Sequence, residues 1–285
     1  MANDLQTLAA LLGLDAALEV ADIGAADIAE TPPYRPLLDA GLARLNAFEA
    51  DARQHGKLRE TYGESLSLFS EVIGDGTEQT LYLAAPASGM TSLLKPDAAR
   101  LAFFNGFSRF GEVHATEPVR TTRLDDVAGL PDLDFLKMDI QGAELMALEH
   151  GQVRLARCAM IHLEVSFTPL YEGQPSFGDI DVWMRRHGFA PHRFTEVKSW
   201  SIAPILRDND VRAPFHQLLE ADVVYMRDLI DPDLDADLLK KTVLLAHGCY
   251  GSPDLAGHIL ARLEVAGHVA AGSFGAYLGM IGVVP

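Results

Sequence analysis

The sequence predicts an α/β fold built around a parallel sheet, and three observations carry that prediction. Residues 134–151 have the pattern of a strand, a Gln-Gly turn and a helix whose apolar residues recur at helical spacing. Further short apolar runs occur at residues 18–23, 42–48 and 160–165. Ionisable residues cluster where these runs end, and open α/β sheets bind ligands beyond the carboxyl ends of their strands.

Composition limits the classes of function. The chain has 285 residues, 48% hydrophobic and 22% charged, which suits one large α/β domain with an appendage. The net charge of −17 disfavours nucleic acid, because a phosphate backbone would be repelled. Cys158 and Cys249 cannot form a disulfide framework, and the first basic residue is Arg35, so no positively charged export signal is expected. These features predict a cytoplasmic protein.

The first strand is expected at residues 18–23, after an amphipathic helix over residues 5–18. Gly24 follows this strand. Because glycine lacks a Cβ, the backbone at Gly24 can approach a ligand closely, and Asp22 would orient the loop. The loop has no second or third glycine, whereas a dinucleotide pyrophosphate requires several, so nicotinamide and flavin dinucleotides are disfavoured.

Prolines shape the chain beyond this loop. Pro32 and Pro33 stop any helix that begins at Ala25, so the next helix is expected near Pro36. A plain structural connection is as good an interpretation as a cover over a pocket.

Glu49 ends the second predicted strand, residues 42–48. It follows Gly24 at about the spacing at which dinucleotide folds place an acid for the ribose hydroxyls. A carboxylate suits a vicinal diol because its two acceptor oxygens meet two donors. An exposed charge at the end of a strand is the structural alternative, but the strand order around Glu49 favours ribose binding.

Less regular chain follows. A third strand is expected at residues 66–73, and the turn Gly74-Asp75-Gly76 would begin a hairpin. Residues 86–117 lack clear periodicity, as binding loops do, and their aromatic residues would either line an acceptor site or pin the loop by burial. His114 closes this segment and is a candidate substrate-binding base, although a lone histidine is more often structural.

The central unit carries the densest group of ionisable residues. Lys137 and Asp139 lie two apart and share one face at the end of the strand, and Glu144 falls in the first helical turn, where the helix dipole favours a carboxylate. In the strand expected at residues 160–165, Glu164 lies near the carboxyl end. If the two strands are neighbours, Asp139 and Glu164 lie side by side.

The last part of the chain should complete the sheet and then become helical. The expected elements are a helix at residues 177–187, strands at 189–194 and 222–227, and helices at 235–246 and after Ser252-Pro253. Residues 265–285 carry no Asp, Glu, Lys or Arg. Because this run includes His268 and five glycines, a buried tail or an oligomer contact is favoured over a membrane span.

Residues 134–144, DFLKMDIQGAE, resemble the signature of the FkbM-type methyltransferases, S-adenosylmethionine-dependent enzymes with a Rossmann-like domain. The family pattern is an apolar run followed by Lys, apolar, Asp, apolar, Glu, Gly, Ala and Glu. The chain departs from it once, with Gln141 at the first Glu. The resemblance covers roughly residues 18–227.

This resemblance implies a Rossmann-like class I methyltransferase fold, in which a seven-strand mixed sheet has its last strand antiparallel. The expected parts are an N-terminal helix at residues 1–17, the methyltransferase domain at 18–228 and a C-terminal helical appendage at 229–285. S-adenosylmethionine is the implied cofactor. Gly24 and Ala25 would contact its methionine part, and Asp75 would accept a hydrogen bond from its adenine.

The implied reaction is methyl transfer to an acceptor oxygen of a small molecule or a sugar, with nitrogen less favoured. Asp139 and Glu164 are expected at the transfer site, where a carboxylate takes the acceptor proton, and Asp139 also borders the cofactor. Lys137 would lower the pKa of the acceptor or pair with Asp139, and Glu144 would bind the substrate unless it is only a helix N-terminal charge. The two carboxylates could ligate a divalent cation, but no third ligand is evident, so chemistry without a metal is expected.

Two other classes stay open. One is a catalytically inactive ligand-binding protein on the same fold, suggested by the glycine-poor loop. The other is a Rossmann-like oxidoreductase, which the missing glycines disfavour. The expected partners are a small-molecule acceptor and, through the C-terminal segment, a second copy of the chain, with neither nucleic acid nor a membrane span.

Overall fold

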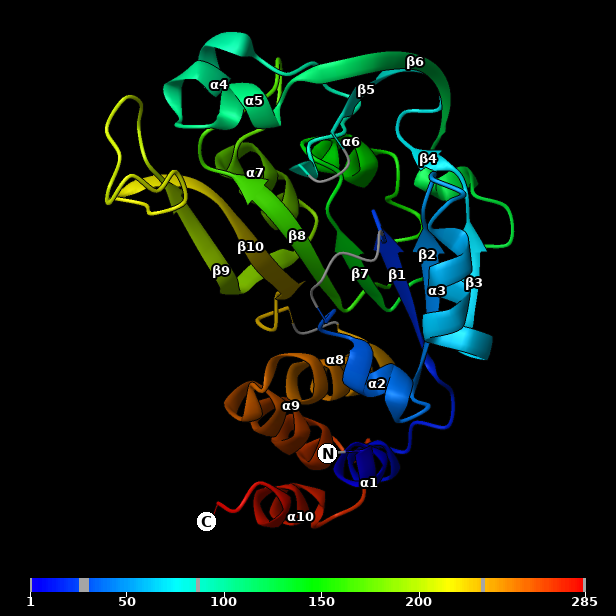
Figure 1. The fold of residues 1–285 in the computed structure, drawn as a ribbon. Helices are drawn as coiled ribbons and strands as arrows, with labels where there is room; N and C mark the ends of the chain where they lie inside the picture. The colour runs from blue at the N-terminus through cyan, green and yellow to red at the C-terminus, as the bar shows by residue number, and fades with distance from the viewer. Residues whose placement is uncertain (1, 26–30, 86–87, 232–233, 284–285) are drawn as a thin grey trace.

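A seven-stranded sheet forms the centre of the protein (Figure 1). The computed structural model describes residues 2–25, 31–85, 88–231 and 234–283. The strand order in the sheet is β3-β2-β1-β7-β8-β10-β9. The strands are β1 Leu18–Ile23, β2 Ala43–Phe48, β3 Leu66–Phe69, β7 Phe135–Met138, β8 Met160–Ser166, β9 Phe189–Trp200 and β10 Gln217–Arg227.

The directions of the strands confirm the predicted Rossmann-like fold. β1, β2, β3, β7 and β8 pair in parallel, whereas β10 pairs antiparallel with both β8 and β9. The last strand is therefore the antiparallel one. The order reverses between β1 and β7, since β2 and β3 lie on one side of β1 and the later strands on the other. This reversal is the topological switch point, where open α/β sheets take their ligands.

Helices cover both faces of the sheet, as the alternation of apolar residues along the strands requires. In β1, Val20 packs with α1 Ala2–Leu12, α2 Arg35–Asp39 and the C-terminal helices, whereas the neighbouring Ala21 packs on the face that carries α6 Glu144–Glu149 and α7 Phe177–Arg186. The short α3, His55–Tyr62, lies between β2 and β3 in the chain and contacts β3.

The C-terminal helices belong to the same hydrophobic core as the sheet. They are α8 Ala236–Tyr250, α9 Pro253–Val265 and α10 Ser273–Met280. α8 packs on α1 and α2, and its Leu244 is fully buried together with Val20 of β1. The helix after β1 is delayed to α2 and carries Pro36 in its first turn, as expected.

The uncharged run at residues 265–285 contains α10, whose Tyr277 is fully buried. Its hydroxyl lies 3.1 Å from Nδ1 of His247 on α8. Within the described ranges, no helix is both long enough and apolar enough to cross a membrane.

A second, three-stranded sheet differs from the sequence prediction. The strand expected at residues 66–73 is split: β3 ends at Phe69, and β4 Val72–Ile73 pairs in parallel with β6 Val113–Thr122. β6 also pairs antiparallel with β5 Glu78–Ala84. The prediction of a single strand was wrong, because β4 pairs with Thr121 and Thr122, which lie far along the chain. The N-terminal helix is also shorter than predicted, because Gly13 with φ 63° follows Leu12.

Two short helices occupy the segment that lacked periodicity, α4 Ala98–Phe103 and α5 Phe107–Phe110. Phe107 makes edge-on ring contacts with Phe110 and Trp200, so the aromatic residues of this segment pack on one another. Figure 1 shows α4, α5 and the three-stranded sheet beyond the arrowheads of the central strands, whereas α1, α9 and α10 lie at the opposite end. A cap of inserted chain therefore lies at the carboxyl ends, the side on which a ligand is expected.

Candidate functional site

Three predicted residues follow adjacent strands at the switch point. The β1–β2 register ends with Ile23 opposite Phe48, so Gly24 and Glu49 are the next residues of neighbouring strands. Asp139 follows β7 on the other side of β1, and its N–H donates to the carbonyl of Ile23 at 3.1 Å. The structure thus brings Gly24, Glu49 and Asp139 to the same edge of the sheet.

Gly24 allows the loop after β1 to lie against the end of β7. Its φ is +84°, and a Cβ at this position would lie 2.1 Å from the carbonyl oxygen of Asp139. The next residue, Ala25, is buried and its N–H donates to the carbonyl of Phe48 at 3.1 Å. Glycine is therefore required here for chain packing, whatever else the loop contacts. Residues 26–30 of the predicted ligand loop lie outside the described residues.

Glu49 is half-buried, and only one of its carboxylate oxygens is hydrogen-bonded to another described residue. Its Oε1 accepts from the N–H of Asp51 at 2.7 Å, while Oε2 makes no hydrogen bond to another described residue. Burial raises the pKa of the Glu49 carboxyl. As far as the described residues show, Oε2 is therefore available to accept from a ligand.

Asp22 lies on β1, two residues before Gly24. It belongs to a buried group of polar side chains that the sequence only partly revealed. The Tyr34 hydroxyl donates to Oδ2 of Asp22 at 2.5 Å, and Nζ of Lys137 lies 3.5 Å from its Oδ1. Burial opposes the charge of Lys137, but Asp22 and Asp139 outweigh it and raise the Lys137 pKa. Lys137 therefore pairs with Asp22 in the structure, where the sequence suggested Asp139. Tyr34 belongs to the segment that the sequence left as either a cover over a pocket or a plain connection, and the structure buries it against Asp22.

Asp139 and Glu164 are neighbours, as their strands implied, and a side-chain amide bridges them. Nε2 of Gln141 donates to Oδ1 of Asp139 at 2.9 Å and to Oε2 of Glu164 at 3.1 Å. Burial, together with Asp139 and then Glu220, raises the pKa of Glu164 well above its ordinary value. The acidic pair of the predicted transfer site is thus present, with the Gln141 amide at its centre.

A lysine and a third carboxylate extend this group. Nζ of Lys198 lies 3.0 Å from Oε1 of Glu220 and 3.6 Å from Oε1 of Glu164. Burial raises the pKa of Glu220. Sequence reasoning missed Lys198 and Glu220, because the antiparallel pairing that sets them opposite each other on β9 and β10 is not visible in either strand alone. The alternation of Glu220 and Asp222 along β10 was the available signal.

His162 supports the floor of the site. It is buried, with Nδ1 3.2 Å from the Tyr250 hydroxyl and Nε2 3.7 Å from Oδ1 of Asp222. Burial opposes the ionised form of Asp222, but His162 and the nearby lysines outweigh it and lower the Asp222 pKa. These contacts support a structural role for His162.

Glu144 closes the turn between β7 and α6. Its Oε1 accepts from the N–H groups of Ile140 at 3.0 Å and Gly142 at 3.1 Å, and the residue is 4% exposed. Burial raises the pKa of the Glu144 carboxyl to about 7. The first-turn position was predicted, but the side chain turns back onto its own loop.

Glu144→Gln is expected to leave stability unchanged near pH 5 and to increase it by about 2–3 kcal/mol near pH 8. A buried acid whose pKa rises from 4.5 to about 7 favours the fold while protonated, so stability falls as the pH rises through that interval. An amide keeps the acceptor oxygen without the charge. Urea denaturation at the two pH values measures the difference. The exposed Glu149→Gln, at the other end of α6, is the control, and equal differences at both pH values would contradict the prediction.

Asp75 and His114 lie apart from this group. Oδ1 of Asp75 accepts from the N–H of Thr77 at 2.8 Å and from its hydroxyl at 2.7 Å, and these bonds lower the Asp75 pKa to about 2. His114 is exposed on β6 of the three-stranded sheet. Within the described residues, no hydrogen bond or ion pair joins either one to Gly24, Glu49 or Asp139.

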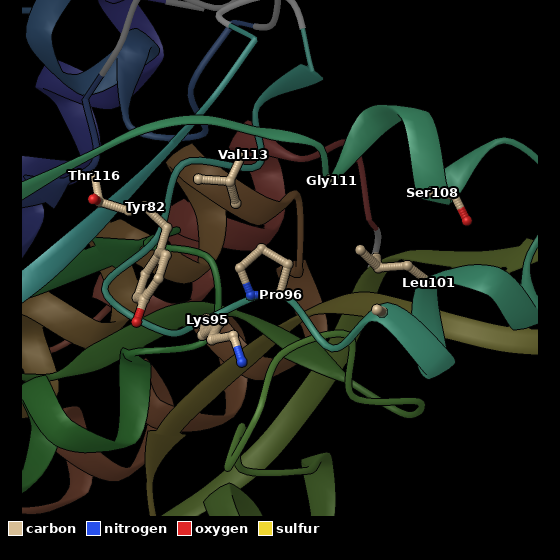
Figure 2. A pocket seen from close by; sticks show the side chains of 9 residues that line it. Tyr82, Lys95, Pro96, Leu101, Ser108, Gly111, Val113 and Thr116 are labelled. Carbon is tan, nitrogen blue, oxygen red and sulfur yellow. The ribbon is translucent and has the colours of Figure 1, made fainter.

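Two hollows lie on the capped side of the sheet. The smaller, about 10 Å³ and so the size of one water, is lined by residues that include Gln141, Glu144, Glu164, Tyr171 and Glu220. The larger, about 380 Å³, has Tyr82, Pro96 and Leu101 around it (Figure 2). A β-bridge between Pro96 and Tyr171 separates the two. None of the predicted site residues lines the larger hollow.

The described residues do not meet the requirements of a metal site. No set of three or more His, Cys, Asp or Glu side chains is placed there to hold a metal ion.

Known proteins resemble the chain in sequence and in fold. The model of the methyltransferase FkbM domain matches residues 22–191. The 2-O-methyltransferase NoeI of Sinorhizobium fredii (strain NBRC 101917 / NGR234) is 30% identical over 162 residues, which are 54% of this chain and 66%, just under two thirds, of that protein.

Two solved structures show a low similarity to the chain. The magnesium protoporphyrin IX methyltransferase ChlM of Synechocystis PCC 6803, with bound SAM, has a TM-score of 0.36 and 12% identity over 80% of this chain and 79% of that one. The precorrin-6y C5,15-methyltransferase of Geobacter metallireducens GS-15 has a TM-score of 0.34 and 13% identity over 78% and 88%.

Proposed function

Because the chain belongs to the FkbM methyltransferase family, we propose that it transfers a methyl group from S-adenosylmethionine to a hydroxyl oxygen of a small molecule or a sugar. One observation carries the proposal: Gly24, Glu49 and Asp139 stand together at the carboxyl ends of three adjacent strands, where the strand order reverses. Ligands of open α/β sheets bind at this point.

The residues present fit S-adenosylmethionine. Its ribose offers two hydroxyl donors, and Glu49 has a half-buried carboxylate with a free oxygen at the correct edge. The cofactor has no phosphate, so a loop with the single glycine Gly24 is sufficient. Gly24, Ala25 and Glu49 would hold it, with Asp22 behind them. Asp75 at the adenine remains a prediction that would depend on its Oδ2, because Oδ1 is engaged by Thr77.

When bound, S-adenosylmethionine supplies an electrophilic methyl group on a sulfonium. Asp139 would take the proton of the acceptor hydroxyl that receives this methyl group. Glu164, whose pKa is raised by burial, would border the acceptor beside Asp139. Lys137 remains charged against Asp22 and offsets the acidity of the site. Most of the rate acceleration comes from holding the two reactants in line.

Oxygen is the favoured acceptor atom for two reasons. Carboxylates that lie close together accept the proton of a hydroxyl, and the relative NoeI is named a 2-O-methyltransferase. The small hollow beside Gln141 admits about one water, so an acceptor must displace side chains there or approach over Lys137 and Asp222, whose side chains are 24% and 27% exposed.

Glu49→Ala is expected to weaken S-adenosylmethionine binding by about 1–3 kcal/mol, roughly 5- to 150-fold, because the ribose loses a charged hydrogen-bond partner. Calorimetric titration of the variant against the parent protein measures the change. Glu60→Ala, an exposed acid on α3, serves as the control and should leave the affinity as it was. An unchanged affinity in Glu49→Ala would remove Glu49 from the cofactor site.

The test of the function is calorimetric titration of the intact protein with S-adenosylmethionine and with S-adenosylhomocysteine, in the presence of a chelator. Micromolar affinity supports the transferase and justifies a screen of hydroxyl acceptors for release of S-adenosylhomocysteine. No heat, together with an unchanged melting temperature at high ligand concentration, would contradict the proposal and favour the inactive ligand-binding protein.

A further inference from the structure

Gln141 makes more polar contacts at the site than the turn around it requires. Besides the two bonds from Nε2 to Asp139 and Glu164, its Oε1 accepts from the Tyr171 hydroxyl at 3.1 Å, and its backbone carbonyl accepts from Oγ of Ser92 at 2.7 Å. Its φ of 55° lies in the left-handed region, which a non-glycine residue rarely adopts. A residue held in this conformation with every polar side-chain atom bonded has one defined orientation.

The chemistry of the amide suits this place. A primary amide nitrogen carries two hydrogens, so one atom can donate to two carboxylates at once. Bonds of this kind to charged acceptors are the stronger class of hydrogen bond. The amide also has no titratable proton. A Glu at this position, which the family pattern carries, would place a third carboxyl group between Asp139 and Glu164.

Charged and titratable groups surround the bridge directly or through one neighbour. They are Lys137 and Asp139 at the end of β7, Glu144 on α6, His162 and Glu164 on β8, Lys198 on β9, Glu220 and Asp222 on β10, and Tyr171 after β8. Carboxyl groups outnumber the cations in this set. Two carboxylates held close without a bridge would share a proton, because like charges at short range cannot both ionise.

We propose that Gln141 is a positioning residue that lets Asp139 and Glu164 lie close together without sharing a proton. This inference rests on the proposed function, because Asp139 is the group assigned to take the acceptor proton and can do so only while ionised. The amide supplies the two donors that a shared proton would otherwise replace, and its Oε1 accepts separately from the Tyr171 hydroxyl.

The test compares melting temperatures of Gln141→Met and Gln141→Glu with the parent protein between about pH 5 and pH 9. Met keeps the length without the donors, and Glu adds a carboxyl group. Without the amide, the ionised Glu164 carboxyl loses a hydrogen-bond donor, so its raised pKa in the fold should rise further and stability should be lost as the pH rises through that pKa. For both variants we expect the fall in melting temperature to be greater at the alkaline end than at the acid end by roughly 3–6 °C.

Two controls separate this role from packing. Tyr171→Phe removes the bond to Oε1 but leaves both carboxylates paired, so its effect should not change with pH. Gln152→Glu adds the same charge at an exposed amide that donates to the Glu149 carbonyl, outside the site. An effect of Gln141→Met and Gln141→Glu that is constant with pH, like that of Tyr171→Phe, would overturn the inference.

The melting series needs neither cofactor nor acceptor, so its outcome is independent of the calorimetric test of function. Once an acceptor is identified, the pH dependence of the turnover rate can be measured. In Gln141→Glu, the acid limb of this profile should move to higher pH by about one unit or more, because the added carboxyl group holds a proton beside Asp139, which must be ionised to act as the base. An acid limb at the parent position would also overturn the inference.

Discussion

Asp139→Asn is expected to lower methyl-transfer turnover by about 10²- to 10⁴-fold and to leave S-adenosylmethionine affinity within about threefold of the parent. An amide at this position cannot take the acceptor proton. It still offers an oxygen to Nε2 of Gln141, and the bond from the residue 139 N–H to the Ile23 carbonyl does not involve the side chain. The variant should therefore fold and bind, and fail at the transfer step.

Turnover is measured as release of S-adenosylhomocysteine with the acceptor found by the screen, and affinity by calorimetry. The exposed Asp208→Asn, in the loop between β9 and β10, makes the same chemical change away from the site and should retain full turnover. If Asp139→Asn keeps more than about a tenth of the parent rate, Asp139 is not the base. Glu164→Gln would then be the variant expected to lose turnover.

The sheet was predictable because its strands repeat short-range patterns. β1 has the predicted bounds, Leu18–Ile23, and the strand at residues 160–165 differs from β8 by one residue. The family resemblance supplied the antiparallel last strand. Residues 66–73 show the limit of this reasoning. Two apolar stretches there are joined only by Ser70 and Glu71, yet the second stretch leaves the main sheet and pairs with β6, and nothing local to the run specifies that partner.

The candidate site was predictable where it depends on strand ends. Asp139 and Glu164 follow neighbouring strands, so their proximity required only that β7 and β8 be adjacent. The partner of Lys137 required the exact register, since Asp22 lies directly opposite it on β1. From the sequence, Asp139 was the expected pairing partner of Lys137. The spacing of residues along the chain does not determine the register between strands, which depends on the whole sheet.

The bridge at Gln141 was beyond sequence reasoning for a different reason. The sequence showed only that Gln141 departs from the family pattern. Its contact with Glu164 depends on a left-handed φ, and its contact with Tyr171 on a segment packed against the turn from elsewhere in the chain. Glu144 is similar: its place in the first turn was evident, but its bonds to Ile140 and Gly142 follow from the shape of that turn.

Gly24→Ala is expected to destabilise the protein by about 3–5 kcal/mol and to weaken S-adenosylmethionine binding at least tenfold. The added Cβ would lie 2.1 Å from the carbonyl oxygen of Asp139. The Cβ has no torsional freedom and the carbonyl is part of the backbone, so one strand end must move. Movement of either end separates Gly24 from Asp139 and disturbs the edge on which the cofactor is proposed to bind. Urea denaturation and calorimetry measure the two losses.

The cost of a positive φ must be separated from the cost of the close approach, and Gly41 offers the comparison. Its φ is +69°, but nothing lies within 4 Å of a Cβ built there. Gly41→Ala should therefore lose only about 1 kcal/mol, the penalty of the left-handed conformation, and should bind cofactor normally. Equal losses in the two variants would mean that the loop after β1 is not held against β7. The placement of Gly24 beside Asp139, and with it the geometry of the transfer site, would then be wrong.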